Sequence, residues 1–68
     1  FDPAAADALI ARLEACAEKL TEYPYMYRTG RVPGTRDALA HPNYILVYRV
    51  AADAVEVLRV LHTRQLYP

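Results

Sequence analysis

Hydrophobic positions in the first third of the chain recur at steps of three and four residues, the spacing that places side chains on one face of a helix. Asp2 suits an N-cap, and Pro3 suits the first helical position, where no N–H is needed. Tyr23 precedes Pro24 and is therefore disfavoured in helical geometry. The pattern predicts a helix over residues 3–22, with an apolar stripe formed by Ala6, Leu9, Leu13, Cys16 and Leu20.

The last third of the chain carries two runs rich in β-branched and aromatic residues, at 44–50 and 55–62, joined by four residues. Such runs with a short link predict an antiparallel hairpin. If Ala52 and Asp53 form the turn, Arg49 faces Glu56 in a favourable cross-strand pair.

This register predicts two largely apolar faces. One would carry Ile45, Val47, Arg49, Glu56, Leu58, Val60 and His62, and the other Tyr44, Leu46, Tyr48, Val50, Val55, Val57, Arg59 and Leu61. Arg59 is then expected to reach the sheet edge or a helix carboxylate such as Glu14 or Glu18. Because one helix can cover only one face, the other is expected to meet another element or another protein.

The middle of the chain is predicted to be a loop from residue 24 to residue 33, followed by a short strand at 35–39. Val32-Pro33-Gly34 has the order of residues typical of a type II turn. The sequence therefore predicts an α+β domain over residues 1–68, in which one helix packs on a twisted antiparallel sheet.

The chain has 68 residues and no net charge, but its charges are unevenly placed. Residues 1–23 hold five acidic and two basic residues, whereas residues 24–68 hold six arginines and three acidic residues. An anionic partner is expected for the arginine-rich part. A domain this small has a limited core, and one cysteine cannot form an internal disulfide, so a partner chain is expected to supply stability.

Composition and residue spacing give no sign of a metal site, a membrane span or a signal peptide. Two histidines and one cysteine show no zinc-ligand spacing, and no metal or cofactor is expected. No apolar run is long enough to cross a bilayer, and the start lacks the basic and apolar regions of a signal peptide. We therefore expect a cytoplasmic protein without membrane contact.

Three segments together resemble the RelE/ParE superfamily of bacterial toxins. They are Gly30-Arg31-x-x-Gly34-Thr35-Arg36, then Pro42-Asn43-Tyr44-Ile45-Leu46-Val47-Tyr48-Arg49-Val50, then Val57-Leu58-Arg59-Val60-Leu61-His62-x-Arg64-Gln65-x-x-Pro68. The resemblance covers nearly the whole chain. It implies the toxin of a type II toxin–antitoxin pair, held in a hetero-oligomer by a cognate antitoxin that wraps the toxin with an otherwise disordered segment.

The resemblance also has a gap. The start at Asp2-Pro3 matches the beginning of the family's second helix, so the family's first strand and first helix have no counterpart here. Their absence would leave apolar surface uncovered, and the antitoxin is expected to bind there by groove and edge-strand recognition. The candidate antitoxin-binding residues are Leu9, Leu13, Tyr25 and Tyr27, although tyrosines in such a loop equally often pack against a helix end.

The superfamily implies two kinds of target. RelE-like toxins cleave messenger RNA on the ribosome and need a base, an acid and cations. Two positions where that branch carries cations hold Ala38 and Ile45 here. The favoured interpretation is therefore a ParE-like inhibitor of DNA gyrase, with Arg36, Arg64 and Tyr67 binding the target. The alternatives are a ribosome-dependent endoribonuclease that uses Arg36, His62 and Arg64, or a degenerate remnant that binds antitoxin only. The plainer interpretation of His62 is that it packs at the end of a strand.

Overall fold

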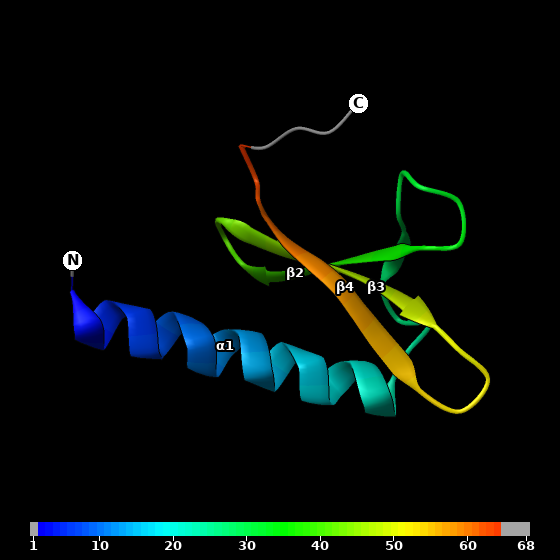
Figure 1. Ribbon diagram of the computed structural model, residues 1–68, viewed down its shortest axis with the longest axis horizontal. Coiled ribbons are helices and arrows are strands. Elements are labelled where there is room, and N and C mark those ends of the chain that lie inside the picture. Colours follow the sequence, from blue (N-terminus) through cyan, green and yellow to red (C-terminus); the bar gives the residue numbers. More distant parts are fainter. Residues whose placement is uncertain (1, 65–68) are drawn as a thin grey trace.

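The computed structural model describes residues 2–64, in which one helix lies on one side of a four-stranded antiparallel sheet (Figure 1). The sheet has the order β1-β2-β3-β4, so each strand lies beside its neighbour in sequence. The elements are α1 (Pro3–Glu22), β1 (Arg28–Thr29), β2 (Arg36–His41), β3 (Tyr44–Val50) and β4 (Val55–His62). The predicted α+β class is confirmed.

Helix α1 begins and ends as the sequence predicts. The Asp2 carboxylate accepts a hydrogen bond from the backbone N–H of Ala4 at 3.0 Å, and Pro3 occupies the first turn. At the other end, the N–H of Tyr23 donates to the carbonyl of Lys19 at 2.8 Å, and Pro24 prevents continuation. The first turns of the helix extend beyond the strands (Figure 1).

The loop predicted for residues 24–33 contains a strand that the sequence analysis missed. Arg28 and Thr29 form β1, which pairs with β2 through Arg28 opposite Asp37 and Thr29 opposite Arg36. Two residues are too few to show an alternating pattern, so only the tertiary pairing reveals this strand. β2 begins one residue later than predicted, at Arg36, and ends two residues later, at His41.

The turn before β2 has the predicted type II geometry. Thr35 donates its backbone N–H to the carbonyl of Val32 at 3.1 Å, and Gly34 has a φ of 84°, which is the conformation that this turn requires at its third position. The Thr35 hydroxyl also donates to the Val32 carbonyl, at 2.7 Å. The turn is therefore held by two hydrogen bonds.

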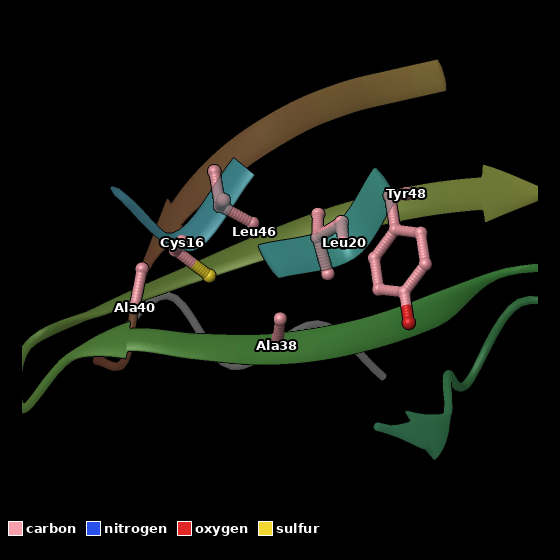
Figure 2. Close-up of a cluster of buried hydrophobic side chains, with 6 residues drawn as sticks. All are labelled: Cys16, Leu20, Ala38, Ala40, Leu46 and Tyr48. Carbon is pink, nitrogen blue, oxygen red and sulfur yellow. The ribbon is translucent and has the colours of Figure 1, made fainter. Parts of the chain in front are cut away.

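The core lies between α1 and the middle of β2 and β3 (Figure 2). Its buried members are Cys16, Leu20, Ala38, Ala40, Leu46 and Tyr48. The small side chains of Ala38 and Ala40 let the helix approach β2, and the larger Leu20 and Tyr48 are fully buried. Leu13, Tyr27, Val50 and Val55 pack around this core.

The hairpin of β3 and β4 follows the predicted register near its turn. Arg49 lies opposite Glu56 and Val50 opposite Val55. Nη2 of Arg49 donates to both carboxylate oxygens of Glu56 at 3.1 Å. The predicted cross-strand ion pair is confirmed.

Further from the turn, the predicted register is wrong. Tyr48 lies opposite Val57, but Val47 lies opposite Arg59, so Leu58 is an extra residue in β4. This β-bulge shifts every later pair by one position and moves the following side chains to the other face of the sheet. A sequence pattern alone cannot reveal the bulge, because both faces of β4 are apolar.

Register and strand alternation define two faces of the sheet. The helix-side face carries Arg36, Ala38, Leu46, Tyr48, Val50, Val55, Val57 and Val60. The open face carries Asp37, Leu39, Ile45, Val47, Arg49, Glu56, Arg59 and Leu61. Because Arg59 lies on the open face, the predicted contact of Arg59 with Glu14 or Glu18 of α1 is wrong.

Candidate interaction surfaces

Arg36 is anchored at the start of β2. Its Nη1 atom donates to the backbone carbonyl of Tyr27 at 2.6 Å, and its guanidinium carbon lies 5.0 Å from the centroid of the Tyr25 ring. A charged donor and a cation–π contact both fix this side chain. Arg36 therefore holds the 24–29 segment against the sheet. Its guanidinium group is already partly used by the Tyr27 carbonyl and the Tyr25 ring.

Tyr48 and Tyr27 also hold the 24–29 segment against the sheet. The Tyr48 hydroxyl donates to the Pro24 carbonyl at 2.7 Å, and the Tyr27 and Tyr48 rings meet edge to face at 6.4 Å. Burial raises the pKa of the Tyr48 phenol, which the nearby Arg36 partly offsets. Burial likewise raises the pKa of the Cys16 thiol, so this cysteine is a protonated core residue.

An aromatic row lies at the opposite end of the sheet, where β3 begins and β4 ends. The Tyr44 ring lies 5.6 Å from the His41 ring and 5.1 Å from the His62 ring. The backbone N–H of Arg64 donates to Nδ1 of His62 at 3.0 Å, and that of Asn43 donates to Nδ1 of His41 at 3.0 Å. These bonds require both Nδ1 atoms to be unprotonated, so each neutral ring carries its proton on Nε2.

Arg64 follows this row, and its side chain is exposed. The backbone of the same segment is held by the N–H of Thr63, which donates to the Asn43 carbonyl at 2.8 Å. Tyr67, the third predicted target-binding residue, lies outside the described residues. Of the predicted target-binding residues, Arg64 is therefore the one that the structure shows to be accessible.

The three predicted nuclease residues do not converge. Arg36 lies opposite Tyr48 on one side of β3, whereas His62 lies opposite Tyr44 on the other side. Tyr44 and Tyr48 are four positions apart, which is about 13 Å along β3, and β2 and β4 are a further ~10 Å apart. Arg64 adjoins His62 but not Arg36.

The four predicted antitoxin-binding residues differ in accessibility. Leu13 and Tyr27 are half-buried and pack against the core. Leu9 is half-buried on the part of α1 nearer its start, and Tyr25 is exposed beside Arg36. Leu9 and Tyr25 therefore offer surface to a partner, while Leu13 and Tyr27 serve the chain's own core.

The sequence analysis missed a row of four residues that crosses the open face. Arg28 lies opposite Asp37, Asp37 opposite Val47, and Val47 opposite Arg59, so the row runs across all four strands. Asp37 and Val47 are buried in its middle, and the two arginines at its ends are exposed. The bulge at Leu58 could not be read from the sequence, and without it Arg59 would not belong to this row.

Two hollows flank the middle of this row. The first, of about 220 Å³, is lined by Val32, Thr35, Val47, Leu58, Arg59 and Leu61. The second, of about 370 Å³, is lined by Met26, Tyr27, Arg28, Asp37, Leu39 and Ile45. The first has mainly apolar walls with one arginine, which suits a protein partner that presents apolar and acidic side chains. The second carries Asp37 as well as Arg28.

Within residues 2–64, no group of three histidine, cysteine or carboxylate side chains is placed to hold a metal ion. The only helix in this part of the chain, α1, is not long and apolar enough to span a membrane.

Comparison with known proteins identifies the family. Residues 1–67 match the family described as the ParE toxin of the type II toxin–antitoxin system parDE. The chain is 43% identical over 68 residues to "Putative toxin Y4kP" of Sinorhizobium fredii (strain NBRC 101917 / NGR234), covering 98% of this chain and 70% of that protein. It is 33% identical over 66 residues to "Toxin RelE2" of Caulobacter vibrioides (strain ATCC 19089 / CIP 103742 / CB 15), covering 97% and 74% respectively.

The chain therefore belongs to the ParE toxin family of type II toxin–antitoxin systems, within the RelE/ParE superfamily. Membership implies an antitoxin as partner. The predicted resemblance is confirmed.

Proposed function

We propose that this toxin acts in the cytoplasm by binding and inhibiting DNA gyrase, and that its cognate antitoxin neutralises it in a hetero-oligomer. The proposal is for a protein-binding inhibitor without a catalytic step. Arg64, at one end of the sheet, is its proposed target contact within residues 2–64, and Tyr67 is kept as a proposed contact from the sequence. Arg36 holds the 24–29 segment at the other end of the sheet through Tyr25 and Tyr27.

The observation that carries this proposal is the separation of the candidate nuclease residues. Ribonucleolysis needs an acid, a base and cations around one phosphate. The Cα atoms of Arg36 and His62 lie about 16 Å apart, by the strand geometry given above. The hydrogen bond to the Tyr27 carbonyl engages the Arg36 guanidinium away from His62, so this set of residues favours binding over RNA cleavage.

The family match adds a second support. The description that matches residues 1–67 names a ParE toxin, and the resemblance of the sequence implies that ParE-like members act on gyrase. The match to a relative named "Toxin RelE2" keeps the nuclease as the alternative that an experiment must address.

The decisive experiment measures both activities of the purified toxin. We expect it to inhibit supercoiling by gyrase and to leave ribosome-bound messenger RNA intact. In cells, induction should cause filamentation and a DNA damage response. Cleaved messenger RNA in the ribosomal A site, with unaffected gyrase, would contradict the proposal and favour the nuclease.

The predicted role of Arg64 has a matched test. We expect Arg64→Ala to weaken gyrase inhibition by about tenfold while the unfolding midpoint is unchanged, because the side chain is exposed beyond β4. Arg12→Ala, on the exposed surface of α1, is the control and should retain full inhibition. Equal inhibition by both variants would exclude Arg64 from the target contact.

A further inference from the structure

The open face of the sheet carries Arg59, which a regular hairpin would place on the other face. In a regular hairpin, residue 59 would follow residue 57 on the helix-side face. The bulge at Leu58 instead places Arg59 opposite Val47, on the face away from α1. Bulges commonly re-aim a side chain next to a functional site. Arg59 thereby becomes part of the first hollow.

The first hollow is an apolar site with one charge. Val47 is 7% exposed and forms part of its lining together with Leu61. Leu58 and Val32 are 46% and 58% exposed, and among the described residues Arg59 is the only charged one in the lining. Large apolar side chains that remain this exposed around a hollow are typical of an interaction site.

The wall of this hollow is formed before any partner binds. Val32 and Thr35 belong to the type II turn, in which both the backbone N–H and the hydroxyl of Thr35 donate to the Val32 carbonyl. The carbonyl of Thr35 in turn accepts from the N–H of Gly30 at 2.8 Å. A site with a fixed wall loses little conformational entropy on binding.

The charge in this hollow identifies the chemistry of its occupant. Arg59 lies opposite an apolar residue, and within residues 2–64 the structure records no ion pair for it. A guanidinium beside an apolar hollow recognises a carboxylate that is presented next to an apolar side chain. The volume of about 220 Å³ admits one large aliphatic or aromatic side chain.

We propose that the first hollow and Arg59 form a binding site for the antitoxin, which inserts one large apolar side chain and pairs a neighbouring Asp or Glu with Arg59. The site is distinct from the surface of Leu9, Leu13, Tyr25 and Tyr27. The family requires an antitoxin, so this occupant exists whatever the target of the toxin is. The proposal does not depend on gyrase being that target.

Charge complementarity favours an acidic segment of the antitoxin. Arg28 and Arg59 end the row across the open face, about 14 Å apart for three strand spacings. The Arg49–Glu56 pair on the same face is internally neutral. The positive charge of this row therefore attracts an acidic segment at long range, and the contact with Arg59 fixes that segment at the first hollow.

The test uses the toxin–antitoxin complex and two matched charge reversals. Arg59→Glu is expected to weaken antitoxin binding by at least about 30-fold, because it places a carboxylate against the antitoxin's carboxylate. Arg28→Glu changes the charge of the same face equally but lies outside the first hollow, and is expected to weaken binding by less than about fivefold. Affinities are measured by isothermal titration, and circular dichroism checks that each variant is folded.

A compensating variant identifies the partner residue. Each Asp and Glu of the antitoxin is changed to Lys, and one such change is expected to restore most of the affinity for Arg59→Glu and none for Arg28→Glu. In cells, Arg59→Glu should remain toxic but escape neutralisation.

Three outcomes would overturn the proposal. Equal losses for the two reversals would mean that the open face attracts the antitoxin only by its general charge. Full affinity of Arg59→Glu would place the antitoxin elsewhere. Retained antitoxin binding with lost toxicity would make the hollow a target site. Failure of gyrase inhibition in the separate supercoiling assay would affect the proposed target and leave this antitoxin site standing.

Discussion

Strands β3 and β4 have nearly the same kind of sequence but very different burial. Leu46, Val47 and Tyr48 of β3 are 2%, 7% and 0% exposed, while Leu58 and Val60 of β4 are 46% and 42% exposed. β3 has a strand on each side and contributes Leu46 and Tyr48 to the core, whereas β4 is an edge strand of the sheet that residues 2–64 form. Apolar composition therefore indicates that a strand will be covered, but not by which chain.

The exposed residues of β4 are where a partner is expected. An edge strand with exposed apolar side chains is a liability in a free protein, and it becomes useful when a second protein covers it. In this toxin the bulge places neighbouring side chains of β4 on different faces of the sheet. Val57 and Val60 face the side of α1, while Arg59 and Leu61 line the first hollow on the open face.

The largest expected effect compares a buried leucine with an exposed one. Leu46→Ala in β3 should lower the free energy of unfolding by about 2–5 kcal/mol, because it leaves a cavity in the core. Leu58→Ala in β4 should cost less than about 1 kcal/mol, since its side chain already meets solvent. Urea denaturation followed by circular dichroism measures both, and equal losses would contradict the contrast between the strands.

A smaller effect is expected for the hydroxyl of Tyr48. Tyr48→Phe removes the hydrogen bond to the Pro24 carbonyl and should cost about 0.5–1.5 kcal/mol. Tyr44→Phe is the control at the start of the same strand, because the structure records no hydrogen bond for its hydroxyl among residues 2–64. Thermal unfolding of the two variants should differ, and identical midpoints would show that the Tyr48 hydrogen bond adds nothing to stability.

The ion pair between the strands should contribute still less. A double-mutant cycle with Arg49→Ala and Glu56→Ala should give a coupling of about 0.2–1 kcal/mol, because both side chains are about half exposed. The coupling should fall as salt is added. A coupling that is large and independent of salt would mean that this end of β4 is better shielded than its exposure indicates.

Three buried or half-buried groups should make the stability of the fold fall in alkali. Burial raises the pKa of Cys16, Tyr27 and Tyr48 above their ordinary values of 9.0 for the thiol and 10.0 for the phenols. The unfolded chain then releases protons before the folded one does, so stability is full below about pH 9 and is lost as the pH rises through the raised values. Chemical denaturation from pH 7 to pH 11 measures this loss.

Tyr48→Phe tests how much one buried phenol contributes to this loss of stability in alkali. Because the variant has one phenol fewer in the core, its loss of stability above pH 10 should be shallower than that of the parent protein. A stability profile that stays flat to pH 11 would show that water reaches these groups in the folded state.

Local patterns predicted much of the fold because they depend on neighbouring residues. The ends of α1 follow from Asp2, Pro3 and Pro24, and the type II turn follows from Pro33 and Gly34. The turn-proximal register of β3 and β4 follows from a short link and from one charge pair. In each case the deciding interaction spans only a few residues of sequence.

The candidate site was less predictable because its members meet only through tertiary pairing. Arg36 was a candidate for an open cation, but the 24–29 segment folds over it and uses its guanidinium. Arg59 was assigned to the helix-side face, and the bulge moved it to the other one. Neither change leaves a signal in the pattern of apolar and polar residues.

The sequence by itself determined the helix, the three longer strands, the turn chemistry and the family, because these rest on local propensity, short-range spacing and shared motifs. Only the tertiary structure decided which face each arginine occupies, that Arg36 and His62 lie far apart, and that β4 is left exposed. The physical reason is that side chains alternate along a strand. One extra residue in a strand with two apolar faces reverses all later positions at little energetic cost, so long-range packing makes the choice.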